Sequence, residues 1–138
     1  MKKNYLLFLF ITVCAYCFGQ ENCSEADSDL IYAYSHVKTA YNSNNIYHLK
    51  EYSKKSLEAF KRAKPKLKVC GCEIAYNKVY DAIDLLEQVE WVETNDEGRF
   101  YVQRARNIAK ASITEMDKCT FAIDEKKATV MVQIEPEN

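Results

Sequence analysis

The stretch LKVCGCEIA, residues 67–75, places two cysteines on either side of a single glycine near the middle of the chain. Two further cysteines lie at equal distances from this pair. Cys23 precedes Cys70 by 70 − 23 = 47 positions, and Cys119 follows Cys72 by 119 − 72 = 47 positions. The central part of the chain therefore consists of two segments of equal length, each with a cysteine at both ends.

The two segments, residues 23–70 and 72–119, share a hydrophobic pattern when one is shifted by 49 positions onto the other. Apolar residues recur at steps of four, three, four and three, which is one stripe of an α-helix. The first stripe consists of Ala26, Leu30, Ala33, Val37 and Ala40, matched by Ala75, Val79, Ala82, Leu86 and Val89. A second, more polar stripe consists of Tyr52, Ser56, Ala59, Ala63 and Leu67, matched by Tyr101, Ala105, Ile108, Ser112 and Met116. Any two amphipathic hairpins would align in this way, but the matched cysteines favour two copies of one hairpin.

Signals for helix ends divide each segment into two helices. Thr94 with Glu97 is typical of a capping box, and the polar run Asn42 to Asn45 is typical of a turn. Pro65 cannot donate a backbone hydrogen bond and should kink the second helix or end it early. The predicted helices lie near residues 24–42, 46–64, 72–93 and 96–119.

These helices predict an all-α fold, with two disulfide-bracketed helical hairpins packed as an up-and-down four-helix bundle. The alternative is a stack of two hairpins that resembles tetratricopeptide repeats in style. That resemblance is limited, because the period here is 49 rather than about 34 residues and two units are fewer than a solenoid needs. The bundle is therefore the preferred arrangement.

The hairpin geometry also predicts which cysteines form disulfides. The first residue of a hairpin lies near its last residue, which favours the pairs Cys23–Cys70 and Cys72–Cys119. The crossed pairs, Cys23–Cys72 and Cys70–Cys119, stay possible because an up-and-down bundle gathers all four cysteines at one end. A Cys70–Cys72 bridge would close a very small ring. A four-thiolate zinc site is a further alternative, but export to an oxidising compartment disfavours it.

The beginning of the chain predicts export. Lys2 and Lys3 precede the apolar run Tyr5 to Phe18, and we interpret Met1 to Gly19 as a signal peptide. The apolar run is shorter than the roughly 20 residues of a membrane helix, so we expect no stable membrane span after its removal. The expected location is secreted or periplasmic.

The remaining chain is expected to hold one helical domain, residues 20–120, followed by a tail, residues 121–138. The stretch Thr129 to Glu135 alternates between apolar and polar residues, which predicts a strand-like or flexible tail. A strand there could pair with the sheet edge of a partner.

Charge narrows the class of partner. Without Lys2 and Lys3 the chain has 17 basic and 20 acidic residues, a net charge of 17 − 20 = −3, which gives no support for a nucleic-acid partner. The stretch Lys50 to Lys68 is basic and the stretch Glu87 to Glu97 is acidic. These stretches form either two solvated, mutually complementary helix faces or a basic surface for an acidic partner.

No sequence motif indicates catalysis. His36 and His48 are the only imidazoles, and no nucleophile motif, phosphate loop, di-iron motif or covalent haem motif accompanies them. We therefore expect no catalytic residue, metal or cofactor, although a haem held by His36 and Met116 stays an alternative.

Tyrosine is abundant, and too many tyrosines occur for one alanine-rich core. Tyrosine is favoured at interfaces because it combines apolar area with a hydrogen-bonding tip. The residues concerned are Tyr32, Tyr34, Tyr41, Tyr47, Tyr76 and Tyr80, with Trp91 nearby in the sequence. The sequence thus predicts an extracytoplasmic, non-enzymatic binding protein whose partner is a protein. The alternatives are a carrier of a small ligand or haem within the bundle and, third, an enzyme. Nothing in the sequence defines an oligomeric state.

Overall fold

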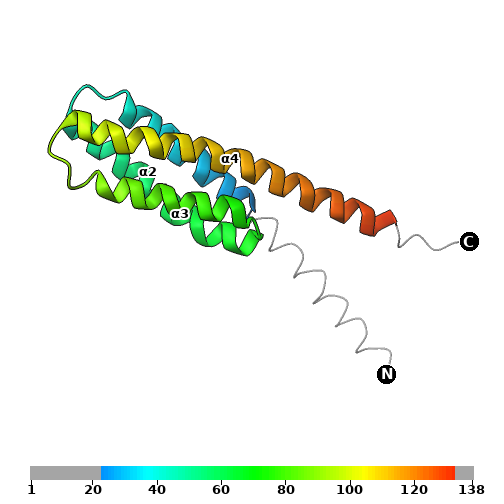
Figure 1. The fold of residues 1–138 in the computed structure, drawn as a ribbon. Coiled ribbons are helices and arrows are strands. Elements are labelled where there is room, and N and C mark those ends of the chain that lie inside the picture. The colour runs from blue at the N-terminus through cyan, green and yellow to red at the C-terminus, as the bar shows by residue number, and fades with distance from the viewer. Residues whose placement is uncertain (1–22, 133–138) are drawn as a thin grey trace, which may run out of the picture.

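The computed structural model describes residues 23–132, which form an up-and-down bundle of four helices (Figure 1). The first helix covers residues 23–41, and the others are α2 (Ile46–Cys70), α3 (Glu73–Gln88) and α4 (Asn95–Val132). Helix α3 packs against both α2 and α4, whereas α2 and α4 make few contacts and lie diagonally across the bundle. The described residues contain no strand, so the predicted all-α bundle is confirmed.

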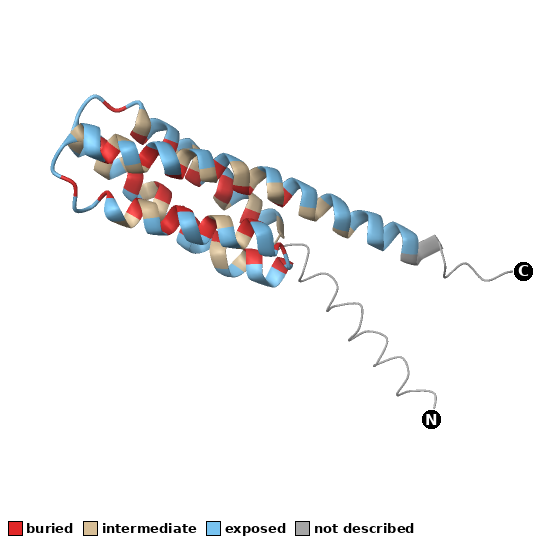
Figure 2. Cartoon of the chain, viewed as in Figure 1, coloured by how far each residue is buried: buried red, intermediate tan, exposed pale blue. Residues whose placement is uncertain are grey.

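Both predicted stripes form the core of the bundle, which Figure 2 shows as buried residues along the facing sides of the helices. All ten residues of the first stripe and its copy are buried. In the second stripe the matched residues Leu67 and Met116 are buried, and Tyr52 and Tyr101 are both half-buried. Most matched positions are therefore buried to a similar degree in the two hairpins, as expected for two copies of one unit, and the exception in the second stripe is half-buried Ile108, whose mate Ala59 is buried.

The two hairpins also begin their second helices in the same way. The Oδ1 atom of Asn45 accepts a hydrogen bond of 2.9 Å from the backbone N–H of His48. In the second hairpin the Oγ1 atom of Thr94 accepts one of 3.3 Å from the N–H of Glu97. The caps are 94 − 45 = 49 positions apart, the same shift that aligns the core stripes. Each cap satisfies a backbone donor that a helix start leaves free, and the Thr94 cap is confirmed.

Helix α2 differs from its prediction because it continues through Pro65 to Cys70. Pro65 is exposed, so the Lys61 carbonyl that loses its helical partner lies where water can solvate it. Beyond the proline, Leu67 and Cys70 are buried in the core and hold the last turns in place. The expectation that Pro65 ends the helix was therefore wrong, because tertiary packing outweighs the local preference.

Replacing this proline should stabilise the protein. In Pro65→Ala the new N–H can bond to the Lys61 carbonyl, and we expect the free energy of unfolding to rise by about 1–3 kcal/mol, as measured by urea denaturation. The matched control is Lys68→Ala, an exposed position in the same helix, where a change below about 0.5 kcal/mol is expected. A loss of stability in Pro65→Ala would contradict this interpretation.

Helix α3 ends at Gln88, earlier than the predicted residue 93. Its last turn has no basic residue. The acidic side chains of Glu87, Glu90 and Glu93 disfavour continuation of the helix there, because the C-terminal end of the helix dipole is negative and repels them. The connection to α4 is still anchored, since Val89 and Val92 are buried.

Helix α4 is longer than predicted and corrects the interpretation of the tail. It continues past Cys119 to Val132 and projects beyond the end of the bundle (Figure 1). The stretch 129–132 is helical, because neither glycine nor proline occurs between Cys119 and Val132 and a helix satisfies its own backbone groups. The strand-like prediction was wrong for these residues. The rest of the predicted tail, residues 133–138, and the predicted signal peptide, Met1 to Gly19, lie outside the described residues.

Hydropathy separates these helices from membrane spans. Within the described part of the chain, no helix combines the length and the apolar character needed to cross a bilayer.

Candidate functional sites: the cysteine end and a groove between α2 and α3

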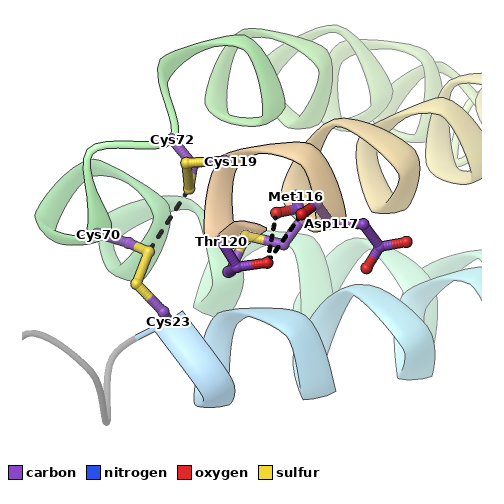
Figure 3. Close-up of a disulfide and its surroundings, with 7 residues drawn as sticks. All are labelled: Cys23, Cys70, Cys72, Met116, Asp117, Cys119 and Thr120. Carbon is purple, nitrogen blue, oxygen red and sulfur yellow. Dashed lines mark hydrogen bonds between the residues drawn. A yellow bond between two sulfur atoms is a disulfide. The ribbon is translucent and has the colours of Figure 1, made fainter. Parts of the chain in front are cut away.

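The four cysteines lie together at the end of the bundle where the two hairpins meet. Two disulfides join Cys23 to Cys70 and Cys72 to Cys119, with Cα–Cα distances of 5.2 and 5.7 Å (Figure 3). The within-hairpin pairing is thus confirmed, and the crossed pairing and the zinc alternative were wrong. Among residues 23–132, no group of three or more His, Cys, Asp or Glu side chains is arranged to hold a metal ion.

The two disulfides touch each other. The Sγ atoms of Cys70 and Cys72 are 3.5 Å apart, marked by the dashed line between them in Figure 3. Neither sulfur carries a hydrogen while both are bridged, so this is a van der Waals contact. Gly71, which joins the two cysteines, adopts a left-handed conformation with φ of 79° and caps α2. A side chain would be strained at this φ, so glycine is required for the tight turn that brings the bridges together.

A hollow of about 370 Å³ lies beside one of the two disulfides. It is lined by residues from the α2–α3 turn, the first turn of α3 and the facing turns of α4. Those residues are Gly71, Cys72, Glu73, Ile74, Ala75, Glu115, Lys118 and Cys119. The Cys72–Cys119 bridge is therefore part of the wall of a surface hollow.

Two carboxylates approach each other between the first helix and α4, one turn away from the cysteines. Burial raises the pKa of Asp27, and the nearby carboxylate of Asp117 raises the pKa of Asp27 further. The Oδ1 atom of Asp27 is buried and has no hydrogen-bond partner. Ionised Asp27 is consequently unfavourable in the folded protein.

This arrangement predicts a pH dependence of stability. The folded state holds the Asp27 proton more tightly than the unfolded chain, so ionisation costs stability as the pH rises from about 3.8, the ordinary value, through the raised pKa. Asp27→Asn removes this cost. Urea denaturation across this pH window should show the stability of the variant, relative to the parent, growing with pH and then levelling off.

Asp117→Asn is the matched control for this prediction. It removes only the smaller of the two causes, so we expect a change of the same sign and smaller size. A relative stability of Asp27→Asn that falls as the pH rises would contradict the assignment.

A second candidate site is a groove of about 680 Å³ between α2 and α3, toward the loop end of the bundle. We call it the α2–α3 groove. Leu57, Leu86 and Val89 contribute apolar surface, and Tyr47 stands at one end with 71 % of its surface exposed. The other lining residues are Lys50, Glu51, Ser53, Lys54, Glu58, Lys61 and Glu90.

The floor of the groove contains a buried hydroxyl. Ser53 is only 2 % exposed, and its Oγ atom has no hydrogen-bond partner. One turn further, the Oγ atom of Ser56 donates a 2.8 Å hydrogen bond to the backbone oxygen of Ala33. Ser53 therefore retains unused hydrogen-bonding capacity beside the groove, which a buried polar group rarely does.

Ion pairs across the bundle neutralise much of the basic stretch of α2. Lys61 pairs with Glu87 of the acidic stretch at 2.7 Å. Lys66 lies 2.9 Å from Asp29, which also accepts a hydrogen bond from Arg62. These contacts favour mutually complementary helix faces over a basic surface for an acidic partner.

The two histidines lie apart from the groove lining. His36 lies 4.2 Å from the ring of Tyr32 and 5.9 Å from that of Tyr52, measured between ring centroids. Burial lowers the pKa of His36, and the positive charge of Lys55 lowers it further. His48 is exposed in the first turn of α2. Met116, the other residue of the haem alternative, is buried in the core near the disulfides (Figure 3).

Several aromatic side chains are exposed, as the abundance of tyrosine led us to expect. Among residues 23–129 the most exposed is Trp91, at 78 %, which follows the groove residue Glu90 in the connection between α3 and α4. The Nζ atom of Lys50 donates a 2.9 Å hydrogen bond to the backbone oxygen of Glu90, which ties this connection to α2. The other exposed aromatic residues are Tyr32, Tyr47, Tyr80, Phe100 and Phe121.

Neither the groove nor the hollow was predicted from the sequence. Leu57 gave the one available signal, because it is an apolar residue of α2 outside the predicted stripe. A single such residue does not indicate that neighbouring helices leave a gap.

Comparisons with known proteins identify no relative from which a function could be inferred. No protein family matches this chain. No curated protein and no solved structure matches it either. The functional argument therefore depends on the geometry of the chain itself.

Proposed function

We propose that this chain is an exported, non-enzymatic binding protein that takes a segment of a protein partner into the α2–α3 groove. The observation that carries the proposal is the apolar surface of the groove, formed by Leu57, Leu86 and Val89 and extended by Tyr47. Apolar anchors in a pocket with a polar rim are the usual source of affinity at protein interfaces.

The charges at the rim of the groove indicate that a partner is recognised by apolar contacts rather than by net charge. Three lysines and three glutamates line it, so their charges cancel. The positive charge of Lys61 is in addition paired with Glu87. Binding should therefore depend only weakly on salt, in contrast to binding at a basic surface.

Export is part of the same proposal. Two disulfides are typical of a protein that works in an oxidising compartment outside the cytoplasm, and the sequence begins with the features of a signal peptide. The disulfides also hold both hairpins closed at the other end of the bundle.

Selection of peptides from a random library tests the proposal and needs no identified partner. The mature protein, residues 20–138, is used to select binders from a library displayed on phage, and their affinities are measured by calorimetry. Tyr47→Ala and Leu57→Ala should each weaken binding by about 10-fold or more, the typical effect at a central anchor.

Tyr80→Ala is the matched control for this experiment, because Tyr80 is also exposed but does not line the groove. It should leave the affinity unchanged. Peptides that lose affinity with Tyr80→Ala but not with Tyr47→Ala or Leu57→Ala would refute the groove as the binding site.

A carrier of a small ligand is the second candidate, favoured by the free hydroxyl of Ser53. The volume of the groove lies within the roughly 300–1,000 Å³ of small-molecule sites. Native mass spectrometry of protein purified from its source should then show a bound molecule that Ser53→Ala loses and Ser56→Ala keeps. Protein that carries no added mass would exclude this candidate.

A further inference from the structure

The contact between the two disulfides has chemical consequences beyond binding. A thiolate replaces one partner of a disulfide by direct attack on a sulfur atom, so an exchange needs the attacking and attacked sulfurs in contact. Cys70 Sγ and Cys72 Sγ already lie 3.5 Å apart while each belongs to a different bridge. If either sulfur is released as a thiolate, its nearest disulfide is the other bridge.

The hollow beside the Cys72–Cys119 bridge provides a way in for an external thiol. Both cysteines of this bridge line the hollow, but Cys119 is half-buried whereas Cys72 is only 2 % exposed. An incoming thiolate therefore meets Cys119 Sγ first, and the bond that breaks releases Cys72.

The helices favour this direction. Cys72 is the N-cap residue of α3, a helix of 16 residues, and a thiolate at a helix N-terminus is stabilised by the helix dipole. Cys70 is the last residue of α2, where the dipole has the opposite sign and disfavours a thiolate. Cys72 is consequently the better leaving group of the two inner cysteines.

We propose that the touching disulfides form a thiol–disulfide relay. In this relay one dithiol reductant opens both hairpin disulfides, Cys23–Cys70 and Cys72–Cys119, and leaves a single disulfide between Cys70 and Cys72. The first thiolate of the reductant bonds to Cys119 Sγ, and the electron pair of the Cys72–Cys119 bond stays on Cys72. The Cys72 thiolate then bonds to Cys70 Sγ, and the electron pair of the Cys23–Cys70 bond leaves with Cys23, which takes up a proton.

The second thiol of the reductant completes the balance. It attacks the mixed disulfide on Cys119, so the reductant leaves oxidised and Cys119 becomes a thiol. Two electrons have then reduced one protein disulfide, and the remaining disulfide has moved to Cys70–Cys72. Gly71 lies between the two cysteines, and the backbone freedom of glycine allows the tight turn that this small ring needs.

A single two-electron reduction thus gives a molecule in which neither hairpin is closed by its disulfide. Small, strained bridges are the labile ones in thiol exchange, so Cys70–Cys72 is suited to pass its disulfide on to another dithiol. This activity is independent of the α2–α3 groove, and neither proposal requires the other.

Partial reduction of the oxidised protein tests the relay. The full mature chain is treated with less than one equivalent of dithiothreitol at mildly alkaline pH, quenched with acid, alkylated with N-ethylmaleimide and digested with trypsin. Cleavage after Lys68, Lys78, Lys118 and Lys126 places the two inner cysteines in one peptide, residues 69–78, and Cys119 in another, residues 119–126.

The two mechanisms give different labels in this experiment. The relay predicts partly reduced molecules that carry label on Cys23 and Cys119, with an internal disulfide in peptide 69–78. Independent bridges would instead label the bracket pairs, Cys23 with Cys70 or Cys72 with Cys119, and that result would overturn the proposal.

Single-cysteine variants provide a second measurement that needs no reductant. In Cys119→Ala the free Cys72 thiol should displace Cys23, so that label moves from Cys72 to Cys23. The matched variant Cys72→Ala leaves Cys119 free but removes the sulfur that touches Cys70, and its Cys23–Cys70 bridge should persist. A Cys119→Ala protein that is labelled only on Cys72 would contradict the relay.

Discussion

Replacing both Cys23 and Cys70 by alanine should lower the free energy of unfolding by about 4 kcal/mol, as measured by urea denaturation under oxidising conditions. The bridge closes a loop with a sequence separation of 47, and the loop-entropy model gives roughly this value for a loop of that size. Since small domains are stable by only about 5–15 kcal/mol, the loss is a large fraction of the total stability.

The repeat supplies an internal control for this prediction. The second bridge also has a separation of 47, so Cys72→Ala/Cys119→Ala should lose the same amount within experimental error. Both double variants leave no unpaired thiol behind, which keeps thiol exchange out of the measurement. A clearly unequal loss would show that one hairpin retains structure in the unfolded chain or that loop closure is not the main effect.

The second large effect is expected for the core of the bundle. Phe60 is fully buried and is the largest of the fully buried side chains in the described part of the chain. The buried residues of the bundle are mostly alanine, valine and serine, whose short side chains cannot reach far into a vacated space. Phe60→Ala should therefore cost about 3–5 kcal/mol of unfolding free energy, the range found when a buried phenylalanine leaves a cavity.

Phe121→Ala is the matched control, since Phe121 is 66 % exposed on the part of α4 that leaves the bundle. We expect a change below about 0.5 kcal/mol, as at other exposed positions. Thermal unfolding followed by circular dichroism measures both variants in the same way. If the two losses were similar, Phe60 would not be the central packing residue that its burial indicates.

Much of the fold could be predicted because the same hydrophobic pattern occurs in both segments, so each inference from one segment could be checked in the other. The stripe from Ala26 to Ala40 and its copy in the second segment indicate the same buried face. The closeness of the first and last residues of a hairpin then favours the within-hairpin pairing, which the structure has, over the crossed one, which the sequence left open. These signals are periodic or covalent, so local exceptions hardly affect them.

The wrong secondary-structure predictions concern places where tertiary contacts, or the absence of a neighbouring strand, decide the structure. Pro65 opposes a helix locally, but buried Leu67 and the bridged Cys70 hold the following turns in place. The alternation at 129–135 is typical of a strand, yet a strand needs a neighbour, whereas the helix observed at 129–132 satisfies its own backbone groups.

The candidate sites were the least predictable part of the molecule. The α2–α3 groove arises where the ends of two helices fail to fill the space between them, and no residue type signals that failure. The contact between the bridges depends on the left-handed turn at Gly71, which the sequence permits but does not require.

The closed hairpins also affect how the protein responds to cutting by a protease. Each bridge turns its hairpin into a covalent ring whose exposed arc contains an interhelical connection, residues 42–45 in one ring and 89–94 in the other. A single cut in either arc opens the ring without releasing a fragment, because the disulfide still holds the two pieces together. A nicked molecule would keep its helices in register and gain only the mass of one water, and its pieces would separate only when its sulfur bridges are reduced.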